Sequence, residues 1–464
     1  MLIRPILGIT AAAALALLAP RAGTAQQKAA RQAALRVPVM VDTLPNGLTL
    51  IVHEDRSAPI VSVNVWYHVG SGDEKTGRTG FAHLFEHLMF MGSEHAPYPA
   101  FDRLLEAAGA NNNGSTNNDR TNYYEEGPAN ALPLMLWLEA DRMGWMLPTM
   151  DSAKVDVQRD VVKNERRERV DNQPYGQSWE TLDRMLYPAG HPYSWPVIGS
   201  MADLSAASLE DVKTFFRTYY APNNAAIVVA GDVRADSVKQ LVRTYFGAIP
   251  RGPAIERNDP AAFTLAKDTA AVLEDRVQLP RLYYRWKGAK DYAPDDAALD
   301  VVTYVLAGAK NSRLTKKLVY DLQLATDVVV FNDAKRMDGD VNLYVTARPG
   351  KALPELQAIV DAEIRRLAQE GPTARELAQA QNAIESLFLQ SLEQVGNKAD
   401  QLNAYYYQTG TPDFFARDLA RYRALTRADV QQAARRYLAA PKAVLSVVPQ
   451  GKPELAAKAQ EVTP

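Results

Sequence analysis

Two histidines and a glutamate in segment 81–89 (FAHLFEHLM) carry the strongest chemical signal in the sequence. Residues four apart share one face of an α-helix, so His83 and His87 can bind one metal ion together. Glu86 lies at the edge of that face, where its carboxylate can reach a metal-bound water. Because neutral imidazole suits Zn²⁺ and a catalytic zinc keeps one position open for water, the segment predicts a zinc-dependent hydrolase site.

The chemistry expected there is hydrolytic attack on a carbonyl group that carries an amine leaving group. Zinc lowers the pKa of its bound water to about 7, and that water attacks the carbonyl. Glu86 takes the proton as general base and then donates it to the leaving amine. All six histidines lie at or before position 191, so the N-terminal half is expected to carry the chemistry.

Hydrophobic patterns place this segment among alternating strands and helices. The helix that carries the histidines is predicted from Gly80 to Met91, and Gly92 ends it. Strands are predicted at 39–43, 48–54, 60–69 and 224–230, the first two joined by the turn at 45–47 (PNG). Further helices are predicted at 98–108, 129–146, 151–169 and 235–246.

The 464 residues exceed one ordinary core and suggest two or three domains. A stretch at 251–269, rich in proline and charge, predicts a linker between an N-terminal zinc-binding domain (26–250) and a C-terminal domain (270–464). In the second domain, strands are expected near 272–286 and at 341–346, and helices at 295–306, 312–322, 354–369, 374–396 and 427–438.

The two domains also resemble each other. A helix that begins at Leu209 leads through a tyrosine and a proline to the strand at 225–229. The helix that begins at Arg427 leads in the same order to a strand at 443–448. This repetition predicts a duplicated α+β domain.

Composition excludes several classes of protein. Fifty-two basic and 54 acidic side chains give a net charge of −2, which attracts neither nucleic acid nor an anionic membrane. The absence of cysteine excludes disulfides, a thiol nucleophile and cysteine-type zinc sites.

Residues 1–25 have the order of a secretory signal peptide. Arg4 precedes the apolar run 6–19, and small residues up to Ala25 predict cleavage there. The alternative is a single membrane anchor, but the run is shorter than the roughly 20 residues that a spanning helix needs. No later segment is apolar enough to span a membrane. We therefore expect a periplasmic or secreted protein.

Several motifs resemble one family of peptidases. They are 80–92 (GFAHLFEHLMFMG), 113–116 (NGST), 161–166 (VVKNER), 191–193 (HPY) and 220–224 (YAPNN). Together they are similar to the signature of the pitrilysin/insulinase family, the inverted-motif HxxEH zinc peptidases. The chain length resembles the short-chain branch, which includes the mitochondrial processing peptidases and their bacterial homologues. The resemblance implies two homologous domains, each a mainly antiparallel sheet packed with helices, that form half of a clamshell chamber.

The resemblance also implies a third zinc ligand. Glu165 matches the family's ligand glutamate, and Glu168, one turn later, is the competing candidate. Both residues are otherwise solvated charges in a run of arginine and glutamate. Gln158 stands where many family members have another glutamate, and it can form hydrogen bonds but cannot carry charge.

The polar stretch 111–125 (NNNGSTNNDRTNYYE) has the composition of a loop or hairpin. In the family the matching segment is an edge strand, on which an extended peptide pairs through backbone hydrogen bonds. The resemblance therefore implies substrate-binding roles for Asn113, Gly114, Ser115 and Thr116, with Asn113 orienting the peptide near the metal.

One part of the family pattern is missing. Segment 312–318 (SRLTKKL) matches the family pattern without gaps. In the family, the following helix bears an arginine and, seven residues later, a tyrosine, and both contact the substrate and the oxyanion. This chain has Val319 and Thr326 there, whereas Arg313 and Tyr320 lie nearby but out of register. The alternatives are that the pair is dispensable here or that the register shifts by one residue.

These observations favour an exported zinc metalloendopeptidase subunit with one Zn²⁺ per chain. Its expected partners are a peptide substrate and a second peptidase-family chain that carries the Arg/Tyr pair, in a heterodimer or alternatively a homodimer. A non-hydrolytic assembly subunit and a peptide-binding module are the alternative functions. The intact set His83, Glu86, His87 and Glu165 argues against a pure scaffold.

Overall fold

The computed structural model describes residues 35–457, and the predicted signal peptide lies outside these residues. The turn at 45–47 joins β1 (Met40–Thr43) and β2 (Thr49–Glu54) into the predicted antiparallel hairpin. Four more strands complete the first sheet: β3 (Ile60–Tyr67), β4 (Asn111–Thr116), β5 (Thr121–Pro128) and β6 (Ala225–Gly231). The strand order is β1-β2-β6-β3-β5-β4, and only β2 and β6 pair in parallel.

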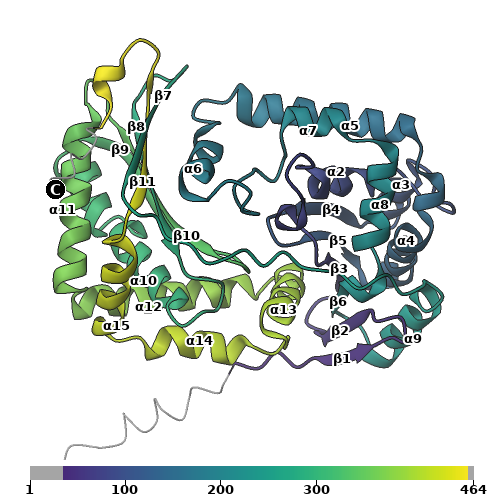
Figure 1. The fold of residues 1–464 in the computed structure, drawn as a ribbon. Coiled ribbons are helices and arrows are strands. Elements are labelled where there is room, and N and C mark those ends of the chain that lie inside the picture. Colours follow the sequence, from purple (N-terminus) through teal and green to yellow (C-terminus); the bar gives the residue numbers. More distant parts are fainter. Residues whose placement is uncertain (1–34, 458–464) are drawn as a thin grey trace, which may run out of the picture. The chain divides into compact units, whose positions relative to one another are not determined.

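The second sheet has the order β7-β11-β8-β10-β9. Its strands are β7 (Thr269–Asp275), β8 (Arg281–Gly288), β9 (Ala325–Ala334), β10 (Gly339–Ala347) and β11 (Lys442–Pro449). Only β7 and β11 are parallel. Two mainly antiparallel sheets packed with helices confirm the predicted fold class (Figure 1).

The two sheets repeat one topology. In each, a parallel pair is followed by three antiparallel neighbours, so β4 and β9 are edge strands at equivalent positions. The helix before β6 is α8 (Leu209–Tyr219), and α15 (Arg427–Ala433) with the π-helix η7 (Ala434–Leu438) precedes β11. Both helices begin with a capping box, formed by Ser208 with Asp211 and by Thr426 with Asp429. This common order supports the predicted duplication.

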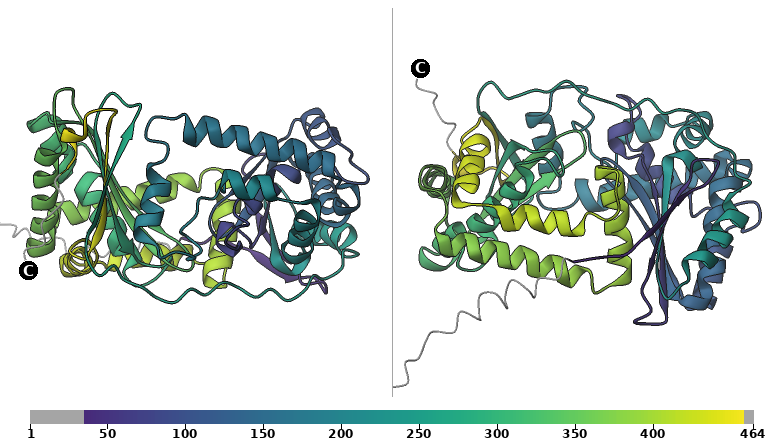
Figure 2. Two further views of the ribbon diagram at one scale, coloured as in Figure 1. Left: turned by 45° about the horizontal axis from the view of Figure 1, so that its top comes forward. Right: turned by 90° about the horizontal axis from the view of Figure 1, so that it is seen from below.

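Helices cover both faces of each sheet (Figures 1 and 2). One face of the first sheet packs on α4 (Leu132–Trp145), α9 (Ala235–Phe246) and α2 (Phe81–Leu88), which supply apolar side chains to one core. Its other face carries α13 (Val395–Thr409), which lies against β3 and β6. In the second sheet, alternate residues of β11 face either the main core or α6 (Ser178–Leu186). Each sheet is therefore covered partly by a helix from the other half of the chain.

The remaining helices complete the two halves. The first half contains η1 (Ser71–Asp73), α3 (Ala100–Ala107), η2 (Ala129–Ala131), η3 (Leu147–Thr149), α5 (Ser152–Arg166), η4 (Arg167–Asp171), α7 (Met201–Ala206) and η5 (Pro222–Asn224). The second contains α10 (Asp296–Ala307), η6 (Thr315–Asp321), α11 (Leu353–Glu370), α12 (Ala374–Ser391), α14 (Phe415–Ala424) and η8 (Pro453–Leu455). The single helix predicted at 374–396 is wrong, because α12 ends at Ser391 and α13 begins at Val395.

Residues 251–268 of the predicted linker form no helix or strand and pack on the first half, and its last residue, Thr269, begins β7. Arg257 donates hydrogen bonds to the carbonyl oxygen of His68 and to the side chain of Asn224. Nδ2 of Asn258 donates to the carbonyl oxygen of Gly72 at 2.8 Å. The domain boundaries around this stretch stay a prediction. Within residues 35–457, every helix is too short or too polar to cross a membrane.

Candidate metal centre

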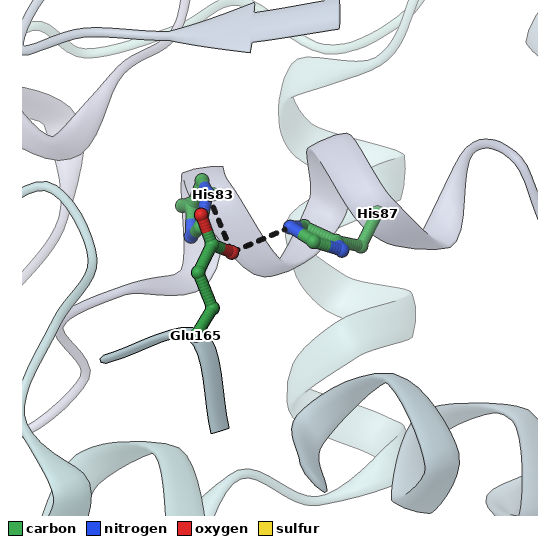
Figure 3. Close-up of side chains that lie close together, drawn as sticks. All are labelled: His83, His87 and Glu165. Carbon is green, nitrogen blue, oxygen red and sulfur yellow. Dashed lines mark ion pairs between the residues drawn. The ribbon is translucent and has the colours of Figure 1, made fainter. Parts of the chain in front are cut away.

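Helices α2 and α5 bring together two imidazoles and one carboxylate (Figure 3). Oε2 of Glu165 lies 3.7 Å from Nε2 of His83 and 3.3 Å from Nε2 of His87. One donor atom from each of the three residues lies within 4.8 Å of the other two, and no other such group occurs in residues 35–457. The competing Glu168 is exposed on η4 and does not belong to this group.

The three side chains fit a zinc ion. Burial lowers the pKa of the His83 imidazole to about 4, so this ring is neutral near pH 7, as a metal ligand must be. Arg169 forms an ion pair with Glu165, with Nη1 and Oε1 2.7 Å apart, and Oε2 of Glu165 faces the histidines. Two neutral imidazoles and one carboxylate are a donor set found in catalytic zinc sites.

A buried carboxylate fixes the start of α2. The two oxygens of Glu74 accept hydrogen bonds from the backbone N–H groups of Gly80, at 3.0 Å, and Ala82, at 2.8 Å. Such contacts satisfy N–H groups that have no partner within a helix. Gly80 has a φ of +88°, and a Cβ atom there would lie 2.7 Å from the carbonyl oxygen of Ile198. Glycine is therefore required where α2 begins.

Arg166, the residue after Glu165, links α5 to the segment where α2 begins. Arg166 is buried, and its Nη1 donates to Oε1 of Glu180 at 2.5 Å and to the carbonyl oxygen of Gly199 at 2.9 Å. A Cβ atom on Gly199 would lie 2.6 Å from the backbone nitrogen of Gly80. The two helices that carry the metal donors are thus held to each other through neighbouring backbone segments.

Glu86 points toward the edge of the first sheet. Oγ1 of Thr116 donates to its Oε2 atom at 2.7 Å, and a Cβ atom on Gly114 would lie 3.1 Å from its Cγ. Burial raises the pKa of Glu86, and the hydrogen bond from Thr116 acts in the opposite direction. The general-base candidate is therefore partly buried and oriented by the strand predicted to bind substrate.

The polar stretch is the hairpin β4–β5, with β4 at the edge of the sheet. Gly114 and Thr116 face α2, so Asn113 and Ser115 face the opposite side of the sheet. Asn113 is exposed, and its Oδ1 atom accepts a hydrogen bond from the backbone N–H of Gly114 at 2.8 Å. The position suits pairing with an extended peptide, and the binding roles of these residues stay predictions.

The structure separates the two positions of the missing Arg/Tyr pair. Val319 lies on η6 and packs partly against the second core, whereas Thr326 lies near the start of β9. They do not share one helix, because η6 ends at Asp321 and the chain then enters a strand. Arg313 forms an ion pair with Glu376, with Nε and Oε1 2.8 Å apart.

Sequence reasoning assigned no role to three residues that orient the site: Glu74, Arg166 and Arg169. An acidic residue close to a helix start is a recognisable N-terminal signal, and Glu74 carries it. No local pattern separates Arg166 and Arg169 from their charged neighbours. Gln158 also contacts this region, since its Nε2 donates to Sδ of Met91 at 2.8 Å, just after α2.

Glu165→Gln is expected to lower zinc affinity by more than about 100-fold, because even groups that only support a ligand are worth about 10–100-fold. Glu168→Gln is the matched control, since it makes the same change one turn away at an exposed position. Zinc affinity is measured by titration against a competing chelator. Equal losses in the two variants would contradict the assignment of Glu165 as the third donor.

Comparisons with known proteins agree with this arrangement. The sequence profile described as Insulinase (Peptidase family M16) matches residues 49–187, which contain all three metal donors. A second profile, described as Peptidase M16 inactive domain, matches residues 206–384. In residues 206–384 there is no comparable group of histidine and carboxylate side chains.

Individual relatives cover most of the chain. Zinc protease PqqE of Helicobacter pylori is 30% identical over 371 residues, which span 79% of this chain and 83% of that protein. A probable mitochondrial-processing peptidase subunit beta of Arabidopsis thaliana is 25% identical over 397 residues, 81% of this chain and 72% of that protein. The solved structure of a protease from Helicobacter pylori has a TM-score of 0.84 at 26% identity and covers 89% of this chain and 100% of its own. The chain therefore belongs to the insulinase family of metallopeptidases, peptidase family M16.

Proposed function

We propose that this chain is a zinc-dependent endopeptidase subunit that hydrolyses extended peptides or unfolded protein segments. The observation that carries the proposal is the convergence of His83, His87 and Glu165 on one point, with Glu86 close by. Relatives named zinc proteases support it, because they cover most of the chain. The edge position of β4 supports an extended substrate, since backbone pairing binds peptides of many sequences.

In this mechanism His83, His87 and Glu165 would hold the zinc ion. When bound there, zinc polarises the scissile carbonyl and makes a water molecule acidic enough to be deprotonated near neutral pH. Glu86 accepts the proton of the attacking water at a carboxylate oxygen and passes it to the leaving amine. The hydroxyl of Thr116 holds the Glu86 carboxylate in place, and β4 aligns the peptide beside it.

The direct test is an assay of the purified chain on an unstructured peptide of ten or more residues. We expect measurable cleavage within the peptide, complete loss on treatment with a zinc chelator, and recovery when zinc is added back. Activity that survives chelation, in protein shown to be free of metal, would contradict the proposal. Binding of the peptide without cleavage at any zinc concentration would instead favour a non-hydrolytic assembly or peptide-binding subunit.

That alternative has an observation in its favour. Residues 206–384 match a domain described as inactive, and within them Val319 and Thr326 stand where the resemblance implies an arginine and a tyrosine. We propose that a second peptidase-family chain completes the site with this pair. The relative named as a processing-peptidase subunit supports pairing, because its name describes one part of an assembly. A second copy of this chain is the other possible partner.

A further inference from the structure

Helix α13 places a carboxylate of the second half on the face of the first sheet that points away from α2 (Figure 1). This residue is Asp400, which is half-buried. Its Oδ1 atom accepts hydrogen bonds from three side chains: Nδ2 of Asn64 at 3.2 Å, Nε1 of Trp66 at 3.0 Å and Nδ2 of Asn122 at 3.2 Å. All three donor residues are buried, so loss of their common acceptor would leave polar groups without partners.

The hydrogen bonds continue from Asp400 to the edge strand. Oδ1 of Asn122 accepts from Oγ of Ser115 at 2.7 Å, across the β4–β5 pair. Nη1 of Arg120 donates to the backbone oxygen and to Oγ of Ser115, at 2.8 and 2.7 Å. The guanidinium of Arg120 lies 5.1 Å from the centre of the Trp66 ring. The position of Ser115 is thus fixed by a network that converges on Asp400.

This network adds to the backbone pairing of β4 with β5, and it is the main support for the face of β4 that points away from α2. A cavity of about 370 Å³ lies beside it, and apart from Gly396 every residue that lines the cavity has a polar side chain. Ser115, Arg120 and Asp400 are among them. Because this face of β4 has no apolar packing, hydrogen bonds must hold the strand in place on this side.

Ser115 is also next to the catalytic machinery. Its neighbours in β4, Gly114 and Thr116, face the other side of the sheet, where they contact Glu86. A displacement of Ser115 therefore moves the segment of edge strand that lies beside the general base. Asp400 itself lies on the opposite face of the sheet and contacts neither Glu86 nor the metal donors.

We propose that Asp400 is a positioning residue, which acts through Asn122 and Ser115 to hold β4 in the geometry that binds an extended peptide. The inference rests on the proposed function, since it assumes that β4 is the peptide-binding edge. It assigns a substrate-binding task to the second half of this chain, which contributes none of the metal donors.

The test measures peptide binding without turnover. A fluorescent peptide of about twelve residues is titrated into zinc-loaded Glu86→Gln protein, with and without Asp400→Ala. We expect Asp400→Ala to raise Kd about tenfold, which corresponds to about 1.4 kcal/mol. Asp400→Asn should cause a smaller rise, because its amide oxygen still accepts hydrogen bonds. Zinc content should not change.

Tyr406→Phe is the matched control. Tyr406 lies on the same helix, and its hydroxyl is 2.9 Å from Oγ1 of Thr49 on β2, far from β4 in the strand order. This variant also loses one hydrogen bond between α13 and the sheet, and we expect its Kd to be unchanged. In an Asn122→Ala background, Asp400→Ala should add little, because both changes interrupt the same connection.

The outcomes separate this proposal from the proposed function. Equal increases of Kd in Asp400→Ala and Tyr406→Phe would overturn it, because α13 would then act only through general stability. An unchanged Kd in Asp400→Ala, or a Glu86→Gln protein that binds no peptide, would overturn it as well. Failure of wild-type protein to hydrolyse a peptide that it binds would contradict the proposed function alone.

Discussion

Glu86→Gln is expected to keep zinc at one ion per chain and to lower kcat by about 10²–10⁴, the usual contribution of a general base. Glutamine has the shape of glutamate and can still accept the hydrogen bond from Thr116, but its amide cannot take up the proton of the attacking water. Metal content is measured on fresh protein, and kcat is measured on the long peptide used to test the function.

Glu106→Gln is a suitable control for that variant. Glu106 is an exposed glutamate on α3 in the same half of the chain, so its replacement removes one charge without touching the site. We expect its kcat to equal that of the wild type. Near wild-type turnover in Glu86→Gln would refute the mechanism, and loss of zinc would assign Glu86 to metal binding instead.

The three residues of the candidate metal centre were predictable from the sequence to different degrees. The spacing of His83 and His87 on a helix is local information, and it predicts a shared face directly. Glu165 lies on another helix, so only resemblance to a family could select it, and Glu168 remained an alternative. The structure brings Glu165 to the histidines because Arg166 and Gly199 hold α5 against the start of α2.

The fold was predictable where local signals are strong. The turn at 45–47 and the long amphipathic helices match the structure closely, because turn chemistry and hydrophobic period act over a few residues. Strand β9 was missed, and the break at 392–394 carries neither glycine nor proline to mark it. The hydrogen bond between the side chains of Asn64 and Asp400 joins residues 336 positions apart, and no local pattern can reveal such a contact.

Val319→Arg combined with Thr326→Tyr is expected to raise kcat/KM of the chain alone by about 10²–10³, because loss of one oxyanion donor typically costs that much. The chain has the candidate metal donors and the proposed base, but the arginine and tyrosine nearest to the missing pair are out of register. Arg313 is paired with Glu376, and Tyr320 is exposed on η6. With the double substitution every copy would carry the pair, so a distinct partner would no longer be needed.

The control shifts the same two side chains by one residue, as Tyr320→Arg with Asp327→Tyr. A gain only in the shifted variant would mean that the match to the family is off by one position. Both double variants should keep the wild-type Tm, since Val319 and Asp327 are only partly buried and Tyr320 and Thr326 are exposed. High activity of the unmodified chain alone, with no gain from either variant, would contradict the need for a partner. The oxyanion contact would then come from another group of this chain, and the search for it would begin with Arg120 in the turn between β4 and β5.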